Sequence, residues 1–343
     1  TPTLADSYTV DGGGTGSFVS TLNGLEENTT YYVRAYVTNE TGTYYGDEVI
    51  FTTMAASQDY HGIIYVTQTG AGSRSGDSWE NAVSSIADAQ TLAVAHNAVV
   101  WVAAGIYYGN TTSANAFIMM DGVSMYGSFA GNEPADYDLS QRNFEANTTI
   151  LDGQNSRRVV YQSNSFNTRT TLDGFTIRNG YTTESGGGAY LRHNTALSNC
   201  RFVNNESQGD GGGLCLYGSY NSYDTIRECS FEHNITGRYG GGLYVSCATI
   251  INSQIANNSC NYGGGGMYLY YANVINGLIA NNSSNDAGGG IYNNYNSSIT
   301  NSTIVRNSSG NRGGGIYASG TTTLVNSVVW GNRWNTAVSS IAN

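Results

Sequence analysis

The chain has 343 residues and a formal net charge of −11, and all 14 of its basic residues are arginine. This balance excludes a nucleic-acid binder that works through a basic face, because phosphate neutralisation needs clustered Lys and Arg. It also disfavours adsorption to an anionic membrane surface. The sequence contains no apolar run of about 18 residues, so it predicts no membrane-inserted helix. The sequence starts at Thr1 without a signal-peptide pattern, so we expect a mature protein or a fragment.

Residues 1–54 have the pattern of an antiparallel β-hairpin. Apolar and polar side chains alternate over 31–37, and a second strand is expected at 48–51, with a turn at 39–42. The segment GLEENTTYYVRAYVTNETGTYYGDEVIFTT resembles the C-terminal half of the fibronectin type III-like modules of Bacteroidetes surface proteins. Such a module needs about 90–100 residues, so we expect a partial module with an unpaired strand edge. Residues 55–61 are expected to be a linker.

Residues 62 to about 171 indicate short strands and one helix. The strand-like segments are 63–67, 98–103, 116–120, 123–129, 149–151 and 159–162, with a further one at 172–177. Asp77 and Glu80 have the spacing of a capping box, which predicts a short helix that begins there and continues to about His96. A helix at this place would cap the open end of a repeat protein, whose first unit otherwise exposes its core.

A regular repeat begins near residue 172. Six Gly triplets are each followed by an apolar residue, and the last glycines of successive triplets are 25, 29, 24, 24 and 25 residues apart. These glycines are Gly188, Gly213, Gly242, Gly266, Gly290 and Gly315. In phase with them, an apolar residue is followed three positions later by Asn; the apolar residues are Phe202, Phe231, Ile255, Ile279, Ile304 and Val329.

The 24–25-residue period predicts an all-β fold, a right-handed parallel β-helix over residues 62–343. The Leu pattern of leucine-rich repeats is absent, and a βα crossover repeat needs a longer unit. Equivalent residues of successive β-helix coils stack about 4.8 Å apart, so the apolar residues that precede Asn are expected to form one continuous core. The single 29-residue spacing locates an insertion at 218–224, which we expect to bulge outward.

The paired signatures resemble those of the chlamydial polymorphic outer-membrane proteins and related bacterial surface β-helices. The opening IIYVTQTG…SGDSWENAVSSIADAQ…VVWVAAGIYY is similar to the entry of right-handed β-helices of the pectate-lyase-like superfamily. Together these resemblances cover residues 60–343, and they depart at the third Gly of the triplet, which is usually Ala in the chlamydial family. They imply the fold, whereas function varies across a superfamily that includes adhesins, lyases, hydrolases and phage tailspikes.

A tyrosine column is the first candidate binding site. An apolar residue follows each Gly triplet, and the next residue is tyrosine in five of the six coils. These tyrosines are Tyr190, Tyr244, Tyr268, Tyr292 and Tyr317, and the sixth coil has Cys215. Strand alternation turns these side chains outward, where a row of rings is suited to stacking on sugars or to a protein contact. The alternative is that the stacked rings only stabilise one another and shield the backbone, and we favour that alternative.

Charged residues that precede the triplets are the second candidate site. Glu184 and Asp210 belong to neighbouring coils, where stacking would bring their carboxylates to about 5 Å, the separation of a retaining glycosidase pair. Arg238, in the following coil, is suited to holding a substrate carboxylate. The alternative, which we favour, is a solvated loop edge without a catalytic role.

The remaining motifs have ordinary structural interpretations, and we expect no metal and no cofactor. Asp121, Asp152 and Asp173 each precede Gly, which is more typical of a turn than of a calcium site. Cys200 and Cys229 occupy equivalent places in adjacent coils, within reach of a disulfide, although we favour buried thiols for the cysteines. Asn-x-Ser/Thr sequons, which the composition generates, occur at Asn28, Asn110, Asn234 and Asn301.

These observations predict an extracellular or cell-surface bacterial protein that binds a glycan or host ligand along the β-helix without catalysis. The first alternative is a polysaccharide lyase or glycoside hydrolase that uses Glu184 and Asp210. The second is a structural subunit of a surface fibre, in which a second copy or another surface protein supplies the strands that the N-terminal module lacks.

Overall fold

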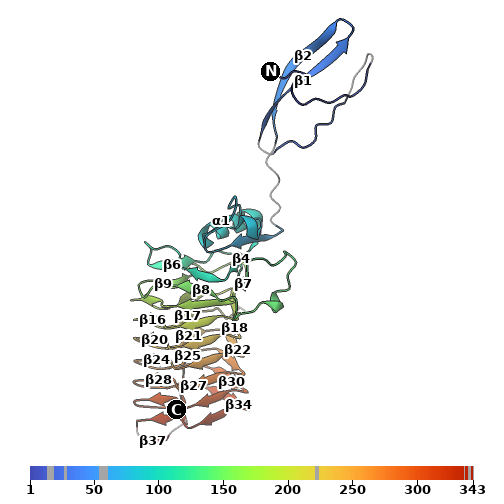
Figure 1. The fold of residues 1–343 in the computed structure, drawn as a ribbon. Coiled ribbons are helices and arrows are strands. Elements are labelled where there is room, and N and C mark those ends of the chain that lie inside the picture. The colour runs from blue at the N-terminus through green and yellow to red at the C-terminus, as the bar shows by residue number, and fades with distance from the viewer. Residues whose placement is uncertain are drawn as a thin grey trace. The chain divides into compact units, whose positions relative to one another are not determined.

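The computed structural model describes residues 1–13, 19–26, 29–53, 61–220, 224–335, 337–338 and 341–342. Over these residues the fold is all-β, with little helix and a parallel β-solenoid of about nine turns (Figure 1). The chain divides into two compact units, Thr1–Asp59 and Tyr60–Asn343.

The first unit contains the predicted hairpin. Strand β1 (Thr30–Asn39) pairs antiparallel with β2 (Gly42–Thr52), with Asn39 opposite Gly42 at the turn. Several large apolar side chains of the two strands are exposed: Tyr32, Val37, Tyr44, Val49 and Ile50. Of the predicted linker, only residue 61 lies within the described residues.

The second unit is built from four parallel sheets that run along the solenoid axis. The first sheet contains β3 (Ile63–Val66), β4 (Val99–Ala103), β7 (Met125–Phe129), β10 (Thr170–Asp173), β14 (Thr195–Ser198), β18 (Thr225–Arg227), β22 (Thr249–Ile251), β26 (Asn273–Ile275), β30 (Ser297–Thr300) and β34 (Thr322–Val325). The second sheet contains β5 (Gly105–Tyr107), β8 (Thr149–Asp152), β11 (Phe175–Arg178), β15 (Arg201–Val203), β19 (Ser230–Glu232), β23 (Gln254–Ala256), β27 (Leu278–Ala280), β31 (Thr303–Val305) and β35 (Val328–Trp330).

The third and fourth sheets complete each coil. The third sheet contains β12 (Tyr181–Thr182), β16 (Glu206–Ser207), β20 (Ile235–Thr236), β24 (Ser259–Cys260), β28 (Ser283–Ser284), β32 (Ser308–Ser309), β36 (Arg333–Trp334) and the antiparallel β37 (Ala337–Val338). The fourth sheet contains β6 (Asn115–Ile118), β9 (Arg158–Tyr161), β13 (Ala189–Arg192), β17 (Leu214–Tyr217), β21 (Leu243–Ser246), β25 (Met267–Tyr270), β29 (Ile291–Asn293), β33 (Ile316–Ala318) and β38 (Ile341–Ala342). A regular coil therefore visits the first, second, third and fourth sheets in turn.

Helix α1 (Ile86–His96) lies at the end of the solenoid that contains the first coils (Figure 1). Its N-cap is Ser85, whose hydroxyl accepts a 3.2 Å bond from the backbone N–H of Asp88. Ile86, Ala89 and Ala93 bury its inner face in the core that it shares with the strands. A capping helix is thus confirmed.

The predicted start of this helix at Asp77 and Glu80 is wrong. That segment forms a 3₁₀ turn, Trp79–Asn81, and a second one lies at Leu139–Gln141. The Trp79 side chain is buried, with its ring centroid 4.7 Å from that of Tyr65, and its indole N–H donates to the carbonyl of Glu133. These tertiary contacts hold the segment in a turn, because a helix would carry the indole away from them.

Each regular coil turns at residues with left-handed backbone conformation. Between the first and second sheets these residues are Asn199, Glu228, Asn252, Asn276, Asn301 and Asn326. Between the second and third sheets they are Asn204, His233, Asn257, Asn281 and Arg306, with φ of 55–57°. Asparagine dominates because it tolerates this conformation better than other residues with a Cβ. The first Gly of each triplet also has positive φ, as in Gly240 at 74°.

The solenoid interior is one continuous apolar core. The predicted inward residues Phe202, Phe231, Ile255, Ile279 and Ile304 have no exposed surface, and Val329 is partly buried against the same core. The strand register aligns them in a single column. The predicted core is therefore confirmed.

A buried asparagine ladder runs beside this column; its members are Asn205, Asn234, Asn258, Asn282, Asn307 and Asn332. In the central example, the backbone N–H and the side-chain amide of Asn282 both donate to Oδ1 of Asn307, and the amide also donates to the carbonyl of Ile255. The same pattern repeats from coil to coil, so the buried amides of neighbouring coils bond to one another and to the backbone.

The third Gly of each triplet makes room for this ladder. A Cβ added at Gly290 would lie 2.7 Å from the carbonyl oxygen of Gly315 and 2.9 Å from the amide nitrogen of Asn307. Gly242 and Gly266 have equivalent surroundings. The departure from Ala at this position, noted in the sequence, therefore has a steric cause.

The insertion at 218–224 is described only at its ends. Tyr220 is exposed, and its ring centroid lies 5.0 Å from that of Tyr271, two coils further on. Asp224 is buried, and its carboxylate accepts a 2.8 Å bond from the backbone N–H of Thr195. Residues 221–223 of the predicted outward bulge lie outside the described residues.

Candidate functional site

The outer face of the fourth sheet carries a column of stacked tyrosine rings, which we call the tyrosine ladder. Its members are Tyr161, Tyr190, Tyr217, Tyr244, Tyr268, Tyr292 and Tyr317, with successive ring centroids 4.6–5.8 Å apart. On β25, the neighbours of Tyr268 in sequence, Met267 and Leu269, point into the core. Alternation along the strands therefore places the rings on the outside, as the sequence predicts.

Cys215 occupies the ladder position of the one coil that lacks tyrosine there. Strand register sets it opposite Tyr190 and Tyr244, and its side chain is fully buried. Tyr217, two residues later on the same face of β17, places its ring 5.8 Å from Tyr190 and 5.4 Å from Tyr244. Tyr217 thus bridges the gap. The repeated position alone does not identify Tyr217. It can be found because side chains two residues apart along a strand lie on the same face.

The ladder leaves ring edges and hydroxyls, rather than ring faces, for a ligand. Tyr244 and Tyr268 stack with their planes 7° apart, and Tyr268 and Tyr292 with theirs 16° apart. Tyr239 packs 5.2 Å from Tyr268, which is only 7% exposed. Burial raises the pKa of the Tyr244 and Tyr268 hydroxyls above the usual value, so both remain protonated hydrogen-bond donors at neutral pH.

Further tyrosines and arginines border the ladder, and of these only Arg238 was a candidate from the sequence. Tyr262 is 52% exposed and packs 5.7 Å from Tyr239, so its ring is the most accessible of this group. Four guanidinium groups lie 5.0–5.9 Å from ring centroids: Arg158 over Tyr161, Arg192 over Tyr190, Arg238 over Tyr239 and Arg312 over Tyr317. Cation–π contacts of this kind restrain the rings that they cover. Neither group is periodic along the chain, so a column search could not find it.

Glu184 and Asp210 each bond to a different arginine. Glu184 Oε2 lies 3.0 Å from the buried guanidinium of Arg158, and the rest of the Glu184 side chain is exposed. Asp210 Oδ1 lies 3.7 Å from Nε of Arg238. Arg238, which the sequence suggested as a ligand for a substrate carboxylate, thus faces a carboxylate of this chain. Catalysis by this pair remains an untested prediction.

The carboxylate of Asp210, near the ladder, has a perturbed pKa. Its side chain is mostly buried, and burial raises its pKa, while Arg238 and the backbone N–H of Tyr239 act in the opposite direction. The same carboxylate raises the pKa of the Cys215 thiol, which burial already raises. A buried, protonated thiol is a poor nucleophile.

The three Asp-Gly motifs lie at turns, and their carboxylates serve separate local contacts. Asp152 pairs with Arg178 at 2.7 Å, and Asp173 pairs with Arg142 at 2.8 Å. Asp121 accepts bonds from two backbone N–H groups, of which that of Thr168 is 2.9 Å away. Within the described ranges, no three His, Cys, Asp or Glu side chains converge as a metal site would require.

The five cysteines are free thiols, so Cys200 and Cys229 form no disulfide. Cys200, Cys215, Cys229 and Cys260 are buried as expected, whereas Cys247 is only partly buried. Several sequons have a structural origin, because five of the six ladder asparagines are followed two residues later by an inward-facing small residue such as Thr236 or Ser284. Asn234 has no exposed surface, and Asn28 lies outside the described residues.

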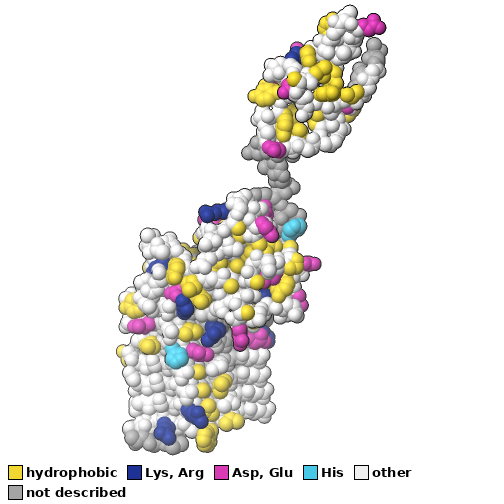
Figure 2. Space-filling model, in the orientation of Figure 1, with side chains coloured by type: hydrophobic (Ala, Val, Ile, Leu, Met, Phe, Trp, Pro, Cys, Tyr) yellow, Lys and Arg dark blue, Asp and Glu magenta, His cyan; other side chains and the backbone are white. Residues whose placement is uncertain are grey.

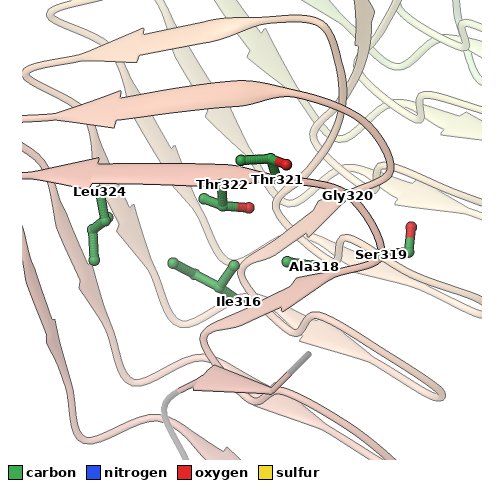
Figure 3. Close-up of a pocket in the computed structure, with 7 residues that line it drawn as sticks. All are labelled: Ile316, Ala318, Ser319, Gly320, Thr321, Thr322 and Leu324. Carbon is green, nitrogen blue, oxygen red and sulfur yellow. The ribbon is translucent and has the colours of Figure 1, made fainter.

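A hollow of about 420 Å³ lies at the last coils, lined by Ile316, Thr322 and Leu324 among others (Figure 3). Leu324 pairs with the buried Ile299 of the preceding coil and is 38% exposed. The hollow is therefore the solenoid interior seen past its last described coil. It presents few polar side chains that could orient a ligand.

Comparisons with protein-family models, with curated protein sequences and with solved structures found no match to this chain. Among the described residues, no helix has the length and hydropathy to cross a lipid bilayer.

Proposed function

We propose that the protein is a non-enzymatic, surface-exposed or secreted binding protein, and that the tyrosine ladder holds an extended neutral glycan along the solenoid. The observation that carries this proposal is the unbroken column of seven rings, with successive centroids 4.6–5.8 Å apart. The stack repeats at the coil spacing of about 4.8 Å, which is close to the length of one sugar residue.

The physical chemistry of the ladder favours a hydroxyl-rich polymer. A rigid row of phenols loses little side-chain entropy on binding, because tyrosine has few rotatable bonds and these are already fixed by stacking. The arginines at the margins add hydrogen-bond donors. Charged side chains are few and scattered over the regular coils on the face seen in Figure 2. With a net charge of −11, the chain should repel heavily sulfated glycans.

The test removes hydroxyls without disturbing the stack. The double variant Tyr244→Phe/Tyr292→Phe should bind cello-, xylo-, manno- or galacto-oligosaccharides about tenfold more weakly, because each lost hydrogen bond contributes roughly 0.5–1.5 kcal/mol. Tyr108→Phe changes an exposed tyrosine of another face and should leave binding unchanged. Isothermal titration calorimetry supplies the affinities. Equal binding by the double variant and the wild type would assign the ladder a purely structural role.

Catalysis is tested in parallel. Reducing-sugar and unsaturated-uronide assays on the same oligosaccharides, and on pectin, should show no turnover. Turnover that disappears in Glu184→Gln would show that the protein is a lyase or hydrolase and not a non-enzymatic binding protein.

A further inference from the structure

A second polar hollow lies at the corner between the second and third sheets, which we call the corner groove. It has a volume of about 400 Å³ and is lined by Asn155, Tyr181, Asn204, Glu206, His233 and Ile235 among others. These residues come from four successive coils. The groove lies on different sheets from the tyrosine ladder, and nothing in the proposed function uses it.

The corner groove departs from the repeat that surrounds it. The outward column of the third sheet reads Tyr181, Glu206 and Ile235 here, and then Ser259, Ser283 and Ser308 in the next three coils. These later coils adopt the same backbone with serine, so the fold does not require the large side chains. Ile235 is 50% exposed, so its side chain adds little to the stability of the fold. Repeat positions freed from a structural role are where a repeat protein places its binding residues.

His233 departs in the same way. It has φ of 56° at the corner where the neighbouring coils place Asn204, Asn257 and Asn281. Histidine tolerates the left-handed region, although less readily than asparagine. His233 therefore places an imidazole at a corner where the backbone favours asparagine.

The backbone on one side of the groove is held in place by hydrogen bonds. The backbone N–H of Asn155 donates to the carbonyl of Asn179 at 2.7 Å, and that of Tyr181 donates to the carbonyl of Arg157 at 2.9 Å. The amide of Asn179 donates to the carboxylate of Asp152, which also pairs with Arg178. Such preorganisation lowers the ordering cost of binding.

We propose that the corner groove is a carbohydrate site that takes a neutral mono- or disaccharide. Tyr181 and Ile235 supply apolar surface for a sugar ring, while Asn155, Asn204 and His233 supply hydrogen-bonding groups for its hydroxyls. The carboxylate of Glu206 accepts hydrogen bonds from sugar hydroxyls and disfavours anionic sugars. The volume is at the small end of the range for ligand sites, which suits one or two rings rather than a polymer.

The test reverts the groove to the sequence of its neighbouring coils. The variant Tyr181→Ser/Glu206→Ser/His233→Asn/Ile235→Ser carries at each position the residue found in later coils, so its circular dichroism spectrum should match the wild type. Ligand-observed NMR and calorimetric titration with glucose, galactose, mannose, N-acetylglucosamine, cellobiose and lactose measure binding. We expect one of these sugars to bind the wild type with a Kd of about 1 mM, and the variant to bind it at least about tenfold more weakly.

Two matched controls separate this site from the tyrosine ladder. Ser283→Ala, in the same column outside the groove, should bind the sugar as the wild type does. Tyr244→Phe/Tyr292→Phe should also retain it, so loss of polymer binding and loss of sugar binding are independent results. If no sugar of the panel binds the wild type, or if the reverted variant binds it equally, the corner groove is not a carbohydrate site. Binding lost only in the tyrosine variant would likewise overturn the assignment.

Discussion

At the scale of single residues, the buried asparagine ladder ties each coil to the next. Asn282 is a typical member: it has no exposed surface, its amide bonds to Asn307 and Ile255, and its Oδ1 accepts two bonds from Asn258. A buried polar group of this kind is stabilising only while all its partners are present, because each orphaned partner then carries its full desolvation cost. The ladder is therefore a point of high sensitivity.

Asn282→Ala should lower the free energy of unfolding by about 3 kcal/mol, because the backbone N–H and the side-chain amide of Asn258 lose the buried acceptor that they share. The adjacent Asn281 is exposed at a left-handed corner, so Asn281→Gly serves as the control and should change stability by less than about 0.5 kcal/mol. Urea denaturation measures both. Equal stabilities for the two variants would show that the ladder contributes no net stabilisation.

Asp210 gives a pH-dependent prediction at the same scale. Because burial raises its pKa in the folded state, the folded protein binds this proton more tightly than the unfolded chain does. Ionised Asp210 therefore destabilises the fold, and its contribution to stability falls as pH rises from below the unfolded pKa of about 3.9 through the higher folded pKa. Asp210→Asn keeps an acceptor for the backbone N–H of Tyr239 and should raise the melting temperature at pH 7. The difference from the wild type should shrink as the pH approaches 3.5; a constant difference would contradict the raised pKa.

At the scale of elements, each regular strand has an inner and an outer face set by its alternation. On β27, Leu278 is 39% exposed and its neighbour Ile279 has no exposed surface. The column that the sequence selected by its phase with the Gly triplets is the inner one, because inward side chains of every coil must fill the closed apolar core.

The two neighbouring residues of β27 provide a matched pair of variants. Ile279→Ala should cost about 2–5 kcal/mol of stability, because it removes buried methyl groups and leaves a cavity. Leu278→Ala should cost less, about 1 kcal/mol, since its side chain is 39% exposed and lies outside the core. Chemical denaturation of both variants compares them. A larger cost for Leu278→Ala would reverse the assigned faces of the second sheet.

Features that repeat could be predicted from the sequence, and features that depend on a single tertiary contact could not. The core column, the hairpin and the outward tyrosines follow from periodicity, which needs no knowledge of distant residues. The start of α1 depends on the burial of Trp79 against Tyr65 and Glu133, and the bridging ring of Tyr217 depends on the small size of Cys215. The corner groove could not be predicted from the sequence, because it consists of departures from the repeat and periodicity identifies only the positions that recur.

At the scale of the whole molecule, the solenoid is a stack in which each coil contacts mainly its two neighbours. The strands of every sheet pair with those one coil away, and the asparagine and tyrosine columns continue through the regular coils. The stability of such a protein is approximately a sum of coil terms and nearest-neighbour interface terms. Its length should therefore be adjustable in units of one coil.

Removal of residues 288–312 tests this additivity. The 25 residues from Gly288 to Arg312 form one complete unit, and Ala287 already stacks on Arg312, so the excision puts Ala287 in the place of Arg312 before Gly313. Tyr268 would then stack on Tyr317, and Asn282 on Asn332, with all four sheets kept in register. We expect a folded protein with an unchanged far-ultraviolet circular dichroism band shape, one cooperative transition and a modestly lower melting temperature, because one coil term and one interface term are lost.

Removal of residues 288–299 is the control: it takes away about half a coil, sets outward residues of later coils against the core, and should prevent folding, since a register shift moves side chains to the wrong face. If both excisions unfold the protein, the coils are not interchangeable units, and the solenoid depends on contacts beyond nearest neighbours.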